Sequence, residues 1–175
     1  MKIVLFDIDQ TLLKASDEAN RDASGIMFRK IINKEVDEGS INNVGMTEMG
    51  IIRAVLEKAR GGNVEQESPP IEVPEEAYVV WADAAREAMR IKPAAVLPGI
   101  KELLDELSQD KEIKLGILSG NSPWRAEAKL VSAGLDHYFC DENGRLLGAF
   151  GNESEKRDTL IEIAKERLGK PGDTA

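Results

Sequence analysis

The stretch Met1-Lys-Ile-Val-Leu-Phe-Asp-Ile-Asp-Gln-Thr-Leu-Leu13 decides the fold. Its apolar run Ile3–Phe6 is rich in β-branched and aromatic side chains, which is typical of a buried strand. Asp7, Asp9 and Thr11 follow at a spacing of two. Neighbouring carboxylates repel each other and are costly to bury, so a cation normally accompanies them. Because open α/β sheets bind ligands beyond the carboxyl ends of their strands, the pattern favours a ligand site over a simple Asp-rich turn.

The composition is that of an ordinary globular protein, long enough at 175 residues for one core with a small insertion. A net charge of −9 argues against nucleic-acid binding, which requires a basic surface. The lone Cys140 excludes an internal disulfide and is consistent with a reducing compartment. No apolar run approaches the ~18 residues needed to cross a bilayer, and no apolar signal segment follows Met1. We therefore expect a cytoplasmic protein without a membrane partner.

The segment after Leu13 is predicted to be mostly helical. Helices are expected over residues 16–34, from a cap at Thr47 to Gly61, and from Pro74 to Met89. A turn at 39–43 and a loop at 63–74 separate them. In the first helix the apolar side chains at helical spacing are Ala23, Ile26, Met27 and Ile31.

A new pattern of helices and strands begins at Val96. The expected order is a helix over 100–107, a strand at Ile113–Leu118, a helix over 123–133, a short strand at Tyr138–Cys140, an extended segment at 146–150 and a last helix over 155–168. Ser122 and Pro123 give the helix over 123–133 a well-defined start. A helical insertion between about Lys14 and Pro93 is the simplest account of the whole chain.

The second strand also ends in polar residues, Ser119 and Asn121. Parallel strands joined by right-handed crossovers place their carboxyl ends along one edge of a sheet, so these residues are expected to meet Asp7 and Asp9. The helix that begins at Pro123 points its free amides at the same edge, where they favour a phosphate. With the basic pair Lys156 and Arg157 also in reach, the pattern favours phosphoryl transfer.

Three of these segments resemble motifs of the haloacid dehalogenase-like superfamily. Asp7–Leu13 is similar to its first motif, Asp-x-Asp-x-Thr-Leu, and Leu115–Asn121 is similar to its second. Residues 150–158 resemble the approach to the third motif, with Arg157 as the better match for its basic residue and Lys156 as the alternative.

Two further segments resemble parts of that family's helical cap. Val96–Ile100 is similar to the segment that re-enters the core after the cap, and Gly45–Glu48 is similar to a cap motif usually seen as Gly-Arg-Thr-Asp. The resemblance implies an α/β fold, with a three-layer Rossmann-like parallel sheet core formed by residues 1–14 and 94–175. Residues 15–93 would form the inserted α-helical cap domain.

The resemblance also implies roles for the two aspartates. Asp7 would be the nucleophile that forms an aspartyl-phosphate, and Asp9 would act as general acid and base. The Asp7 carboxylate and the Asp9 backbone carbonyl would hold Mg²⁺, which offsets the repulsion between nucleophile and phosphate. Because dehalogenating relatives usually lack the second aspartate, Asp9 argues against dehalogenation.

Other residues would position the loop and the phosphate. Thr11 would orient the loop, Ser119 would hydrogen-bond a phosphoryl oxygen and Arg157 would stabilise charge on the transferring group. The remaining candidates for substrate or phosphate binding are Gly120, Asn121, Lys156 and Thr47. For Thr47, a helix cap is the competing interpretation.

The fourth motif of the family, an apolar strand followed by Gly-Asp and a further acidic residue, is missing. Gly172–Asp173 has matching letters, but no strand precedes it. We therefore expect a core that is incomplete at its C-terminus, as in a truncated chain, and an exposed apolar edge at Ile3–Phe6. Weak Mg²⁺ binding, poor hydrolysis and association of the monomer through that edge would follow.

Three functions are compatible with the sequence. The leading one is a Mg²⁺-dependent phosphatase, similar to phosphoglycolate phosphatase, that acts on a small phosphorylated metabolite. The second is a phosphomutase of the hexose-phosphate type, which is weakened because Gly45–Glu48 lacks the arginine of the cap motif. The third is an inactive, truncated domain that binds a ligand or a partner chain.

Overall fold

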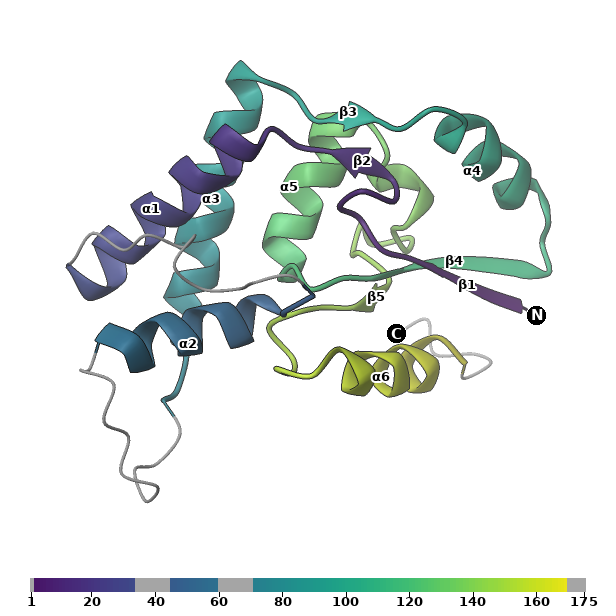
Figure 1. Cartoon of the computed structure of the whole chain (residues 1–175). Coiled ribbons are helices and arrows are strands. Elements are labelled where there is room, and N and C mark those ends of the chain that lie inside the picture. The colour runs from purple at the N-terminus through teal and green to yellow at the C-terminus, as the bar shows by residue number, and fades with distance from the viewer. Residues whose placement is uncertain (1, 34–44, 60–70, 170–175) are drawn as a thin grey trace.

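The computed structural model describes residues 2–33, 45–59 and 71–169. A group of helices forms one end of the molecule and a sheet flanked by helices forms the other (Figure 1). The expected turn at 39–43, most of the expected loop at 63–74, and Gly172–Asp173 lie outside the described residues.

The two expected buried strands lie side by side in a parallel sheet. β1 (Lys2–Phe6) pairs with β4 (Ile113–Leu118), which also pairs in parallel with β5 (Gly148–Ala149), giving the order β1-β4-β5. Both strand predictions are confirmed, and β5 lies in the extended segment expected at 146–150. β1 forms one edge of the described sheet, where its apolar side chains are half-buried. Association through this edge stays a prediction.

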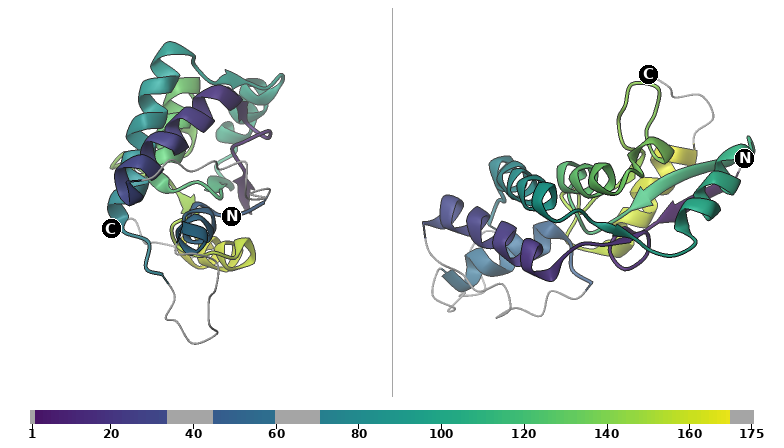
Figure 2. Two further views of the ribbon diagram at one scale, coloured as in Figure 1. Left: turned by 60° about the vertical axis from the view of Figure 1, so that its left-hand side comes forward. Right: turned by 90° about the horizontal axis from the view of Figure 1, so that it is seen from above.

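Helices cover both faces of this sheet, as expected for a three-layer α/β core. α6 (Arg157–Gly169) packs on β4 and β5. α4 (Ile100–Gln109) and α5 (Pro123–Ala133) lie on the opposite side, as Figures 1 and 2 show.

The remaining helices form the other end of the molecule. α1 (Asp17–Ile32) packs against α3 (Glu75–Ile91), which also packs against α5, while α2 (Glu48–Ala59) lies nearer α6 (Figure 1). A small antiparallel pair, β2 (Leu13–Lys14) with β3 (Ala95–Val96), joins the places where this helical segment begins and ends. Within the described part of the chain, no helix has both the length and the apolar character needed to cross a bilayer.

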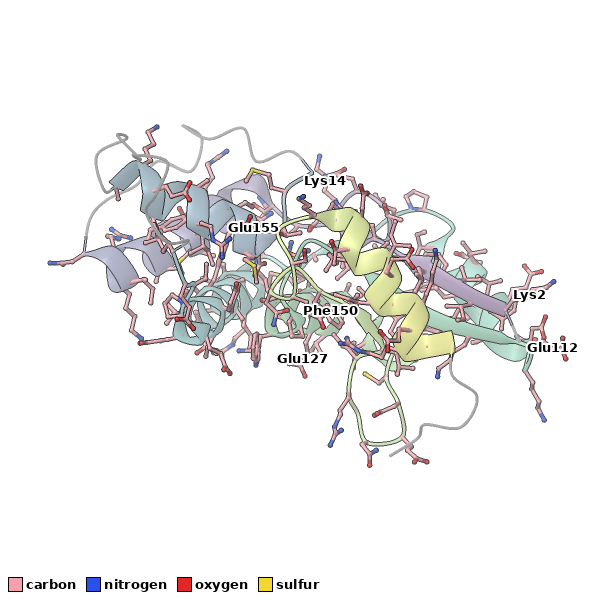
Figure 3. The ribbon with its side chains drawn as sticks, turned by 90° about the horizontal axis from the view of Figure 1, so that it is seen from below. Lys2, Lys14, Glu112, Glu127, Phe150 and Glu155 are labelled. Carbon is pink, nitrogen blue, oxygen red and sulfur yellow. The ribbon has the colours of Figure 1, made fainter. Side chains whose placement is uncertain are left out.

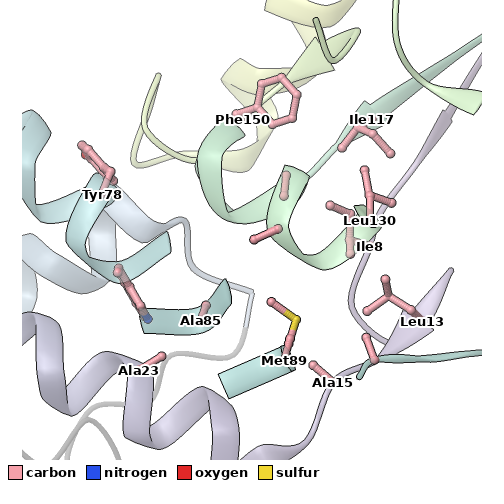
Figure 4. Close-up of a cluster of buried hydrophobic side chains, with 14 of the residues drawn as sticks. Ile8, Leu13, Ala15, Ala23, Tyr78, Ala85, Met89, Ile117, Leu130 and Phe150 are labelled. Carbon is pink, nitrogen blue, oxygen red and sulfur yellow. The ribbon is translucent and has the colours of Figure 1, made fainter. Parts of the chain in front are cut away.

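Buried apolar side chains run continuously from the sheet into the helices. Figure 4 shows Ile117 and Leu130 near the sheet, Met89 in the middle, and Ala23 and Tyr78 on the helical side of one cluster. Residues from the expected core and the expected cap therefore share one hydrophobic cluster. Whether residues 15–93 form a separate domain stays a prediction.

Some local predictions were wrong. Tyr138–Cys140 is not a strand, because Asp136–Tyr138 form a 3₁₀ turn and Cys140 makes only an isolated bridge to Leu146. An apolar run of only three residues occurs in short strands and also in turns that bury one aromatic side chain. Here the segment is such a turn, and it buries Phe139. Ser122 stands at the N-cap of α5, but its Oγ makes no hydrogen bond to the described residues.

The N-terminus of α2 is fixed to the core by close backbone contacts. The Glu48 amide donates to the Gly120 carbonyl at 2.8 Å, and the Met49 amide donates to the Gly151 carbonyl at 2.9 Å. These amides have no partner within their own helix, so the core loops satisfy them. A Cβ at position 151 would lie 1.7 Å from the Gly120 carbonyl oxygen, so this packing requires glycine there. Nearby, Arg53 of α2 forms an ion pair with Glu155. Glu155, labelled in Figure 3, lies just before the start of α6.

Two glycine-to-alanine substitutions test this contact. We expect Gly151→Ala to lower the free energy of unfolding by about 2 kcal/mol, because the added methyl group forces the Gly120 loop away from α2. Gly25→Ala in α1 is the matched control, since a Cβ there meets nothing within 4 Å. It should raise stability by about 0.5 kcal/mol through better helix propensity. Urea unfolding measures both, and equal effects of the two substitutions would contradict the packing described.

Candidate active site

The loops that follow β1 and β4 meet at one cleft with a volume of about 560 Å³. Residues of the helical segment close its other side, among them Asn20, Met46 and Glu48. Of the residues predicted from the sequence, those that line the cleft are Asp7, Asp9, Ser119, Gly120, Asn121 and Arg157.

Three other predicted residues lie outside this cleft. Thr11 is exposed in the turn after β1, where its amide donates to the Ile8 carbonyl at 3.3 Å. Thr47 is fully buried, and its Oγ1 accepts a hydrogen bond from the Gly50 amide at 3.2 Å, so it caps α2. Lys156 is exposed, whereas the neighbouring Arg157 reaches the cleft. Of the two basic candidates, the structure therefore places Arg157 beside the aspartates.

Asp7 is held in one orientation but stays open to a ligand. Its Oδ2 accepts a hydrogen bond from Arg157 Nη2 at 2.7 Å, and its Oδ1 accepts one from the Ile8 amide at 2.8 Å. The Asp7 side chain is 34% exposed. A small molecule in the cleft can therefore approach a carboxylate and a guanidinium together.

Asp9 belongs to a network of polar side chains from three parts of the chain. Lys129 Nζ donates to both Asp9 oxygens at 2.8 and 2.6 Å, and Asn121 Nδ2 donates to Oδ2 at 2.8 Å. Lys129 also donates to Asn121 Oδ1 at 2.9 Å. The Asn121 amide groups donate in turn to Ser119 Oγ at 2.9 and 3.2 Å. The loop after β4 and helix α5 thus hold Asp9 in place.

This network sets the ionisation of Asp9. Burial acts to raise the pKa of Asp9, but the Lys129 ammonium and the hydrogen bonds from Asn121 and Lys129 outweigh it and lower that pKa. Burial, assisted by the nearby Arg125, lowers the pKa of Lys129, although Asp9 acts against this shift. Asp9 is therefore ionised at neutral pH, and the buried ammonium beside it holds its proton less tightly than a surface lysine.

Sequence reasoning missed the two cations that α5 supplies to the cleft, Arg125 and Lys129. They are four residues apart, so they lie on one face of the helix. That face is covered, because Ala126, Ala128 and Leu130 beside them are also buried. The sequence does hold a signal for them, because both are charged residues among the small and apolar positions of a helix that starts at a loop expected to bind phosphate.

The described carboxylates supply only part of a magnesium site. Asp7 offers its carboxylate and Asp9 its backbone carbonyl, and Mg²⁺ accepts such a pair when water and phosphate oxygens fill its other positions. Over residues 2–33, 45–59 and 71–169, no group of three or more His, Cys, Asp or Glu side chains is arranged to hold a metal. The Asp9 carboxylate is also already paired with Lys129.

Several solved structures share this fold. CbbY from Rhodobacter sphaeroides in complex with phosphate has 18% sequence identity and a TM-score of 0.65, over 98% of this chain and 74% of that chain. The same values hold for a CbbY mutant in complex with xylulose-1,5-bisphosphate. A hydrolase from Pseudomonas syringae has 19% identity and a TM-score of 0.56, over 97% of this chain and 71% of that chain. At these low sequence identities the comparison shows a shared fold and nothing further. No curated protein matches the sequence.

The family comparison agrees with the sequence motifs. A family model described as a hydrolase, haloacid dehalogenase-like, matches residues 1–175. The matched region includes the Asp7–Leu13 motif, the parallel sheet and the loop at Ser119, all of which were expected from the resemblance. The chain therefore belongs to the haloacid dehalogenase-like hydrolase family.

Proposed function

We propose that this chain is a phosphatase that hydrolyses a small phosphorylated metabolite through an aspartyl-phosphate on Asp7. One observation supports the proposal: two partly exposed carboxylates line the same cleft, Asp7 in contact with Arg157 and Asp9 in contact with Lys129. Nucleophilic attack on a phosphate ester needs such a carboxylate, together with positive charge for the phosphoryl oxygens.

The first step makes the acyl phosphate. An Asp7 oxygen attacks phosphorus, and the bond from phosphorus to the leaving oxygen breaks. Arg157, whose Nη2 lies 2.7 Å from Asp7 Oδ2, donates hydrogen bonds to the phosphoryl oxygens. Ser119 accepts two hydrogen bonds from Asn121, so its hydroxyl proton is left to bind a phosphoryl oxygen.

The protons move through Asp9 and Lys129. The ionised Asp9 takes a proton from Lys129, whose Nζ lies 2.6 Å from its Oδ2, and passes it to the leaving oxygen, which leaves Asp9 ionised and Lys129 neutral. In the second step a water attacks the acyl phosphate, Asp9 takes the water proton, and Lys129 is protonated again. The ionised state of Asp9 suits this base role.

Mg²⁺ bound to the Asp7 carboxylate and the Asp9 backbone carbonyl would supply positive charge between the nucleophile and the phosphate. With only these protein ligands in the described residues, the affinity of the site for Mg²⁺ is expected to be low.

Phosphate release from a panel of small phosphate esters, with and without Mg²⁺, tests the proposal. We expect release that increases with Mg²⁺ up to concentrations on the order of millimolar. Asp7→Asn should lower the rate by about a thousandfold or more, because it removes the nucleophile. Its unfolding temperature should change little, since the lost ion pair is partly exposed.

Asp83→Asn in α3 is the matched control, because Asp83 is an exposed carboxylate that pairs with Arg86 and does not line the cleft. It should keep wild-type activity. Full activity of Asp7→Asn, or absence of release from every ester at any Mg²⁺ concentration, would overturn the proposal. Conversion between two sugar phosphates without release would indicate a phosphomutase instead.

The Asp9–Lys129 pair predicts a pH dependence of stability. The pKa of Asp9 is lowered in the folded chain, so its ionisation stabilises the fold above its unfolded pKa, and this contribution is lost as the pH falls through the folded pKa. In Lys129→Met the cation that lowers this pKa most is gone, so the pKa of Asp9 lies higher than in wild type and less stability is lost as the pH falls. The free energy of unfolding of wild type minus that of Lys129→Met should therefore decrease by about 1 kcal/mol or more between pH 7 and pH 3.

Lys165→Met is the control for this measurement, because Lys165 pairs with Glu162 on the exposed side of α6. An exposed pair contributes little, so the corresponding difference should stay nearly constant with pH. Urea unfolding at a series of pH values gives both differences. A flat profile for Lys129→Met would show that Lys129 does not set the ionisation of Asp9.

A further inference from the structure

A third charged pair, Glu48 with Arg125, lines the same cleft and has no part in the steps above. Glu48, the first residue of α2, accepts a hydrogen bond on Oε1 from Arg125 Nη1 at 3.0 Å. Both side chains are buried, with 2% and 9% of their surfaces exposed. Arg125 Nη2 also donates to Asn20 Oδ1 at 3.2 Å, and the guanidinium lies 4.2 Å from the centre of the Trp81 ring. Residues from three other helices, α1, α2 and α3, therefore hold this guanidinium.

Two atoms of this pair lack a hydrogen-bond partner among the described residues. They are Glu48 Oε2, an acceptor, and Arg125 Nε, a donor, and both are buried. Unpaired charged groups of this kind are unfavourable, and both residues line the cleft. A bound group that both donates and accepts hydrogen bonds can pair with either atom. A hydroxyl group has this capacity, whereas a carboxylate only accepts.

Charge limits what can bind beside this pair. Arg125 is already engaged by Glu48, Asn20 and Trp81, and the unpaired atom of Glu48 belongs to a carboxylate. A second carboxylate brought next to Glu48 would place like charges together in a partly dry cleft, which is unfavourable. A neutral group with hydroxyls meets no such repulsion.

The position of the pair relates it to the leaving group. Arg125 and Lys129 are one turn apart on α5, and side chains at this spacing have Cβ atoms roughly 6 Å apart. Because Lys129 holds Asp9, the Glu48–Arg125 pair lies one helical turn from the residues that act on the ester oxygen. A short polyol chain attached to that oxygen is long enough to reach it.

We propose that Glu48 and Arg125, with Asn20, form the subsite that selects the leaving group, and that it accepts neutral, hydroxyl-bearing leaving groups and rejects carboxylated ones. This assignment rests on the proposed phosphatase function. It narrows the substrate class to phosphate monoesters of small polyols or sugars.

Two probes that differ at one carbon test the subsite: glycerol 3-phosphate and 3-phosphoglycerate, which carry CH₂OH and COO⁻ at the same place. Calorimetric titration into the full chain carrying Asp7→Asn measures binding without turnover. We expect glycerol 3-phosphate to bind at least about tenfold more tightly. In the Asp7→Asn/Glu48→Gln chain this ratio should fall toward one, because the amide removes the charge and offers a donor to the carboxylate.

Glu155→Gln in the Asp7→Asn chain is the matched control, since Glu155 also pairs with an arginine, Arg53, but does not line the cleft. Its ratio should equal that of the Asp7→Asn parent. Asn20→Asp in the same parent is a second variant, for the case in which Glu48→Gln does not fold. Asn20 is half-buried in the cleft wall, and the added charge should widen the ratio several-fold.

Equal affinities of the two probes for the parent, or a ratio that neither Glu48→Gln nor Asn20→Asp changes, would overturn the subsite. Phosphate release by the chain with Asp7 intact is measured separately with the same two esters. If it releases no phosphate while the affinity ratio holds, the phosphatase proposal fails and the selectivity of the subsite stands.

Discussion

Pairing of carboxylates with cations holds the cleft together. Asp7 pairs with Arg157, Asp9 with Lys129, and Glu48 with Arg125. Each pair joins segments that are distant in the sequence, so the cleft forms only when the sheet, α2, α5 and α6 are all in place. Without the cations, acidic side chains gathered at one sheet edge would repel each other and raise each other's pKa. The net charge of −9 therefore says little about this site, because a phosphate meets the local field of its three cations.

The sequence predicts those parts of the site that depend on strand ends. Ile3–Phe6 and Ile113–Leu118 are apolar runs that end in polar residues, and the crossover rule places their carboxyl ends at one edge. Asp7, Asp9, Ser119 and Arg157 do meet there. Both ends of α5 were also predictable from local signals. Proline at the first helical position, Pro123, marks its start, and a glycine after the last position, Gly134, marks its end.

The sequence alone does not decide the outcome where tertiary packing sets it. Taken alone, Arg125 and Lys129 have the character of solvated surface charges. They are buried because α3 packs against α5 and both side chains lie in the wall of the cleft. Thr47 had two interpretations, a substrate contact and a helix cap. Its hydrogen bond from the Gly50 amide identifies it as the cap of α2. Lys156 and Arg157 are adjacent, so only the orientation of the first turn of α6 determines which one reaches Asp7. For Thr47 and for the pair Lys156 and Arg157, no local pattern in the sequence decides between the alternatives.

Phosphorylation of Asp7 can be measured directly on the protein during turnover. Rapid acid quenching while an ester is being hydrolysed, followed by mass spectrometry of the peptides, shows which side chain carries a phosphoryl group. We expect it on the peptide that contains Asp7, with loss of the signal after hydroxylamine treatment, which cleaves acyl phosphates. A phosphoryl group on another residue, or steady hydrolysis without any phosphorylated Asp7, would contradict the role assigned to this carboxylate.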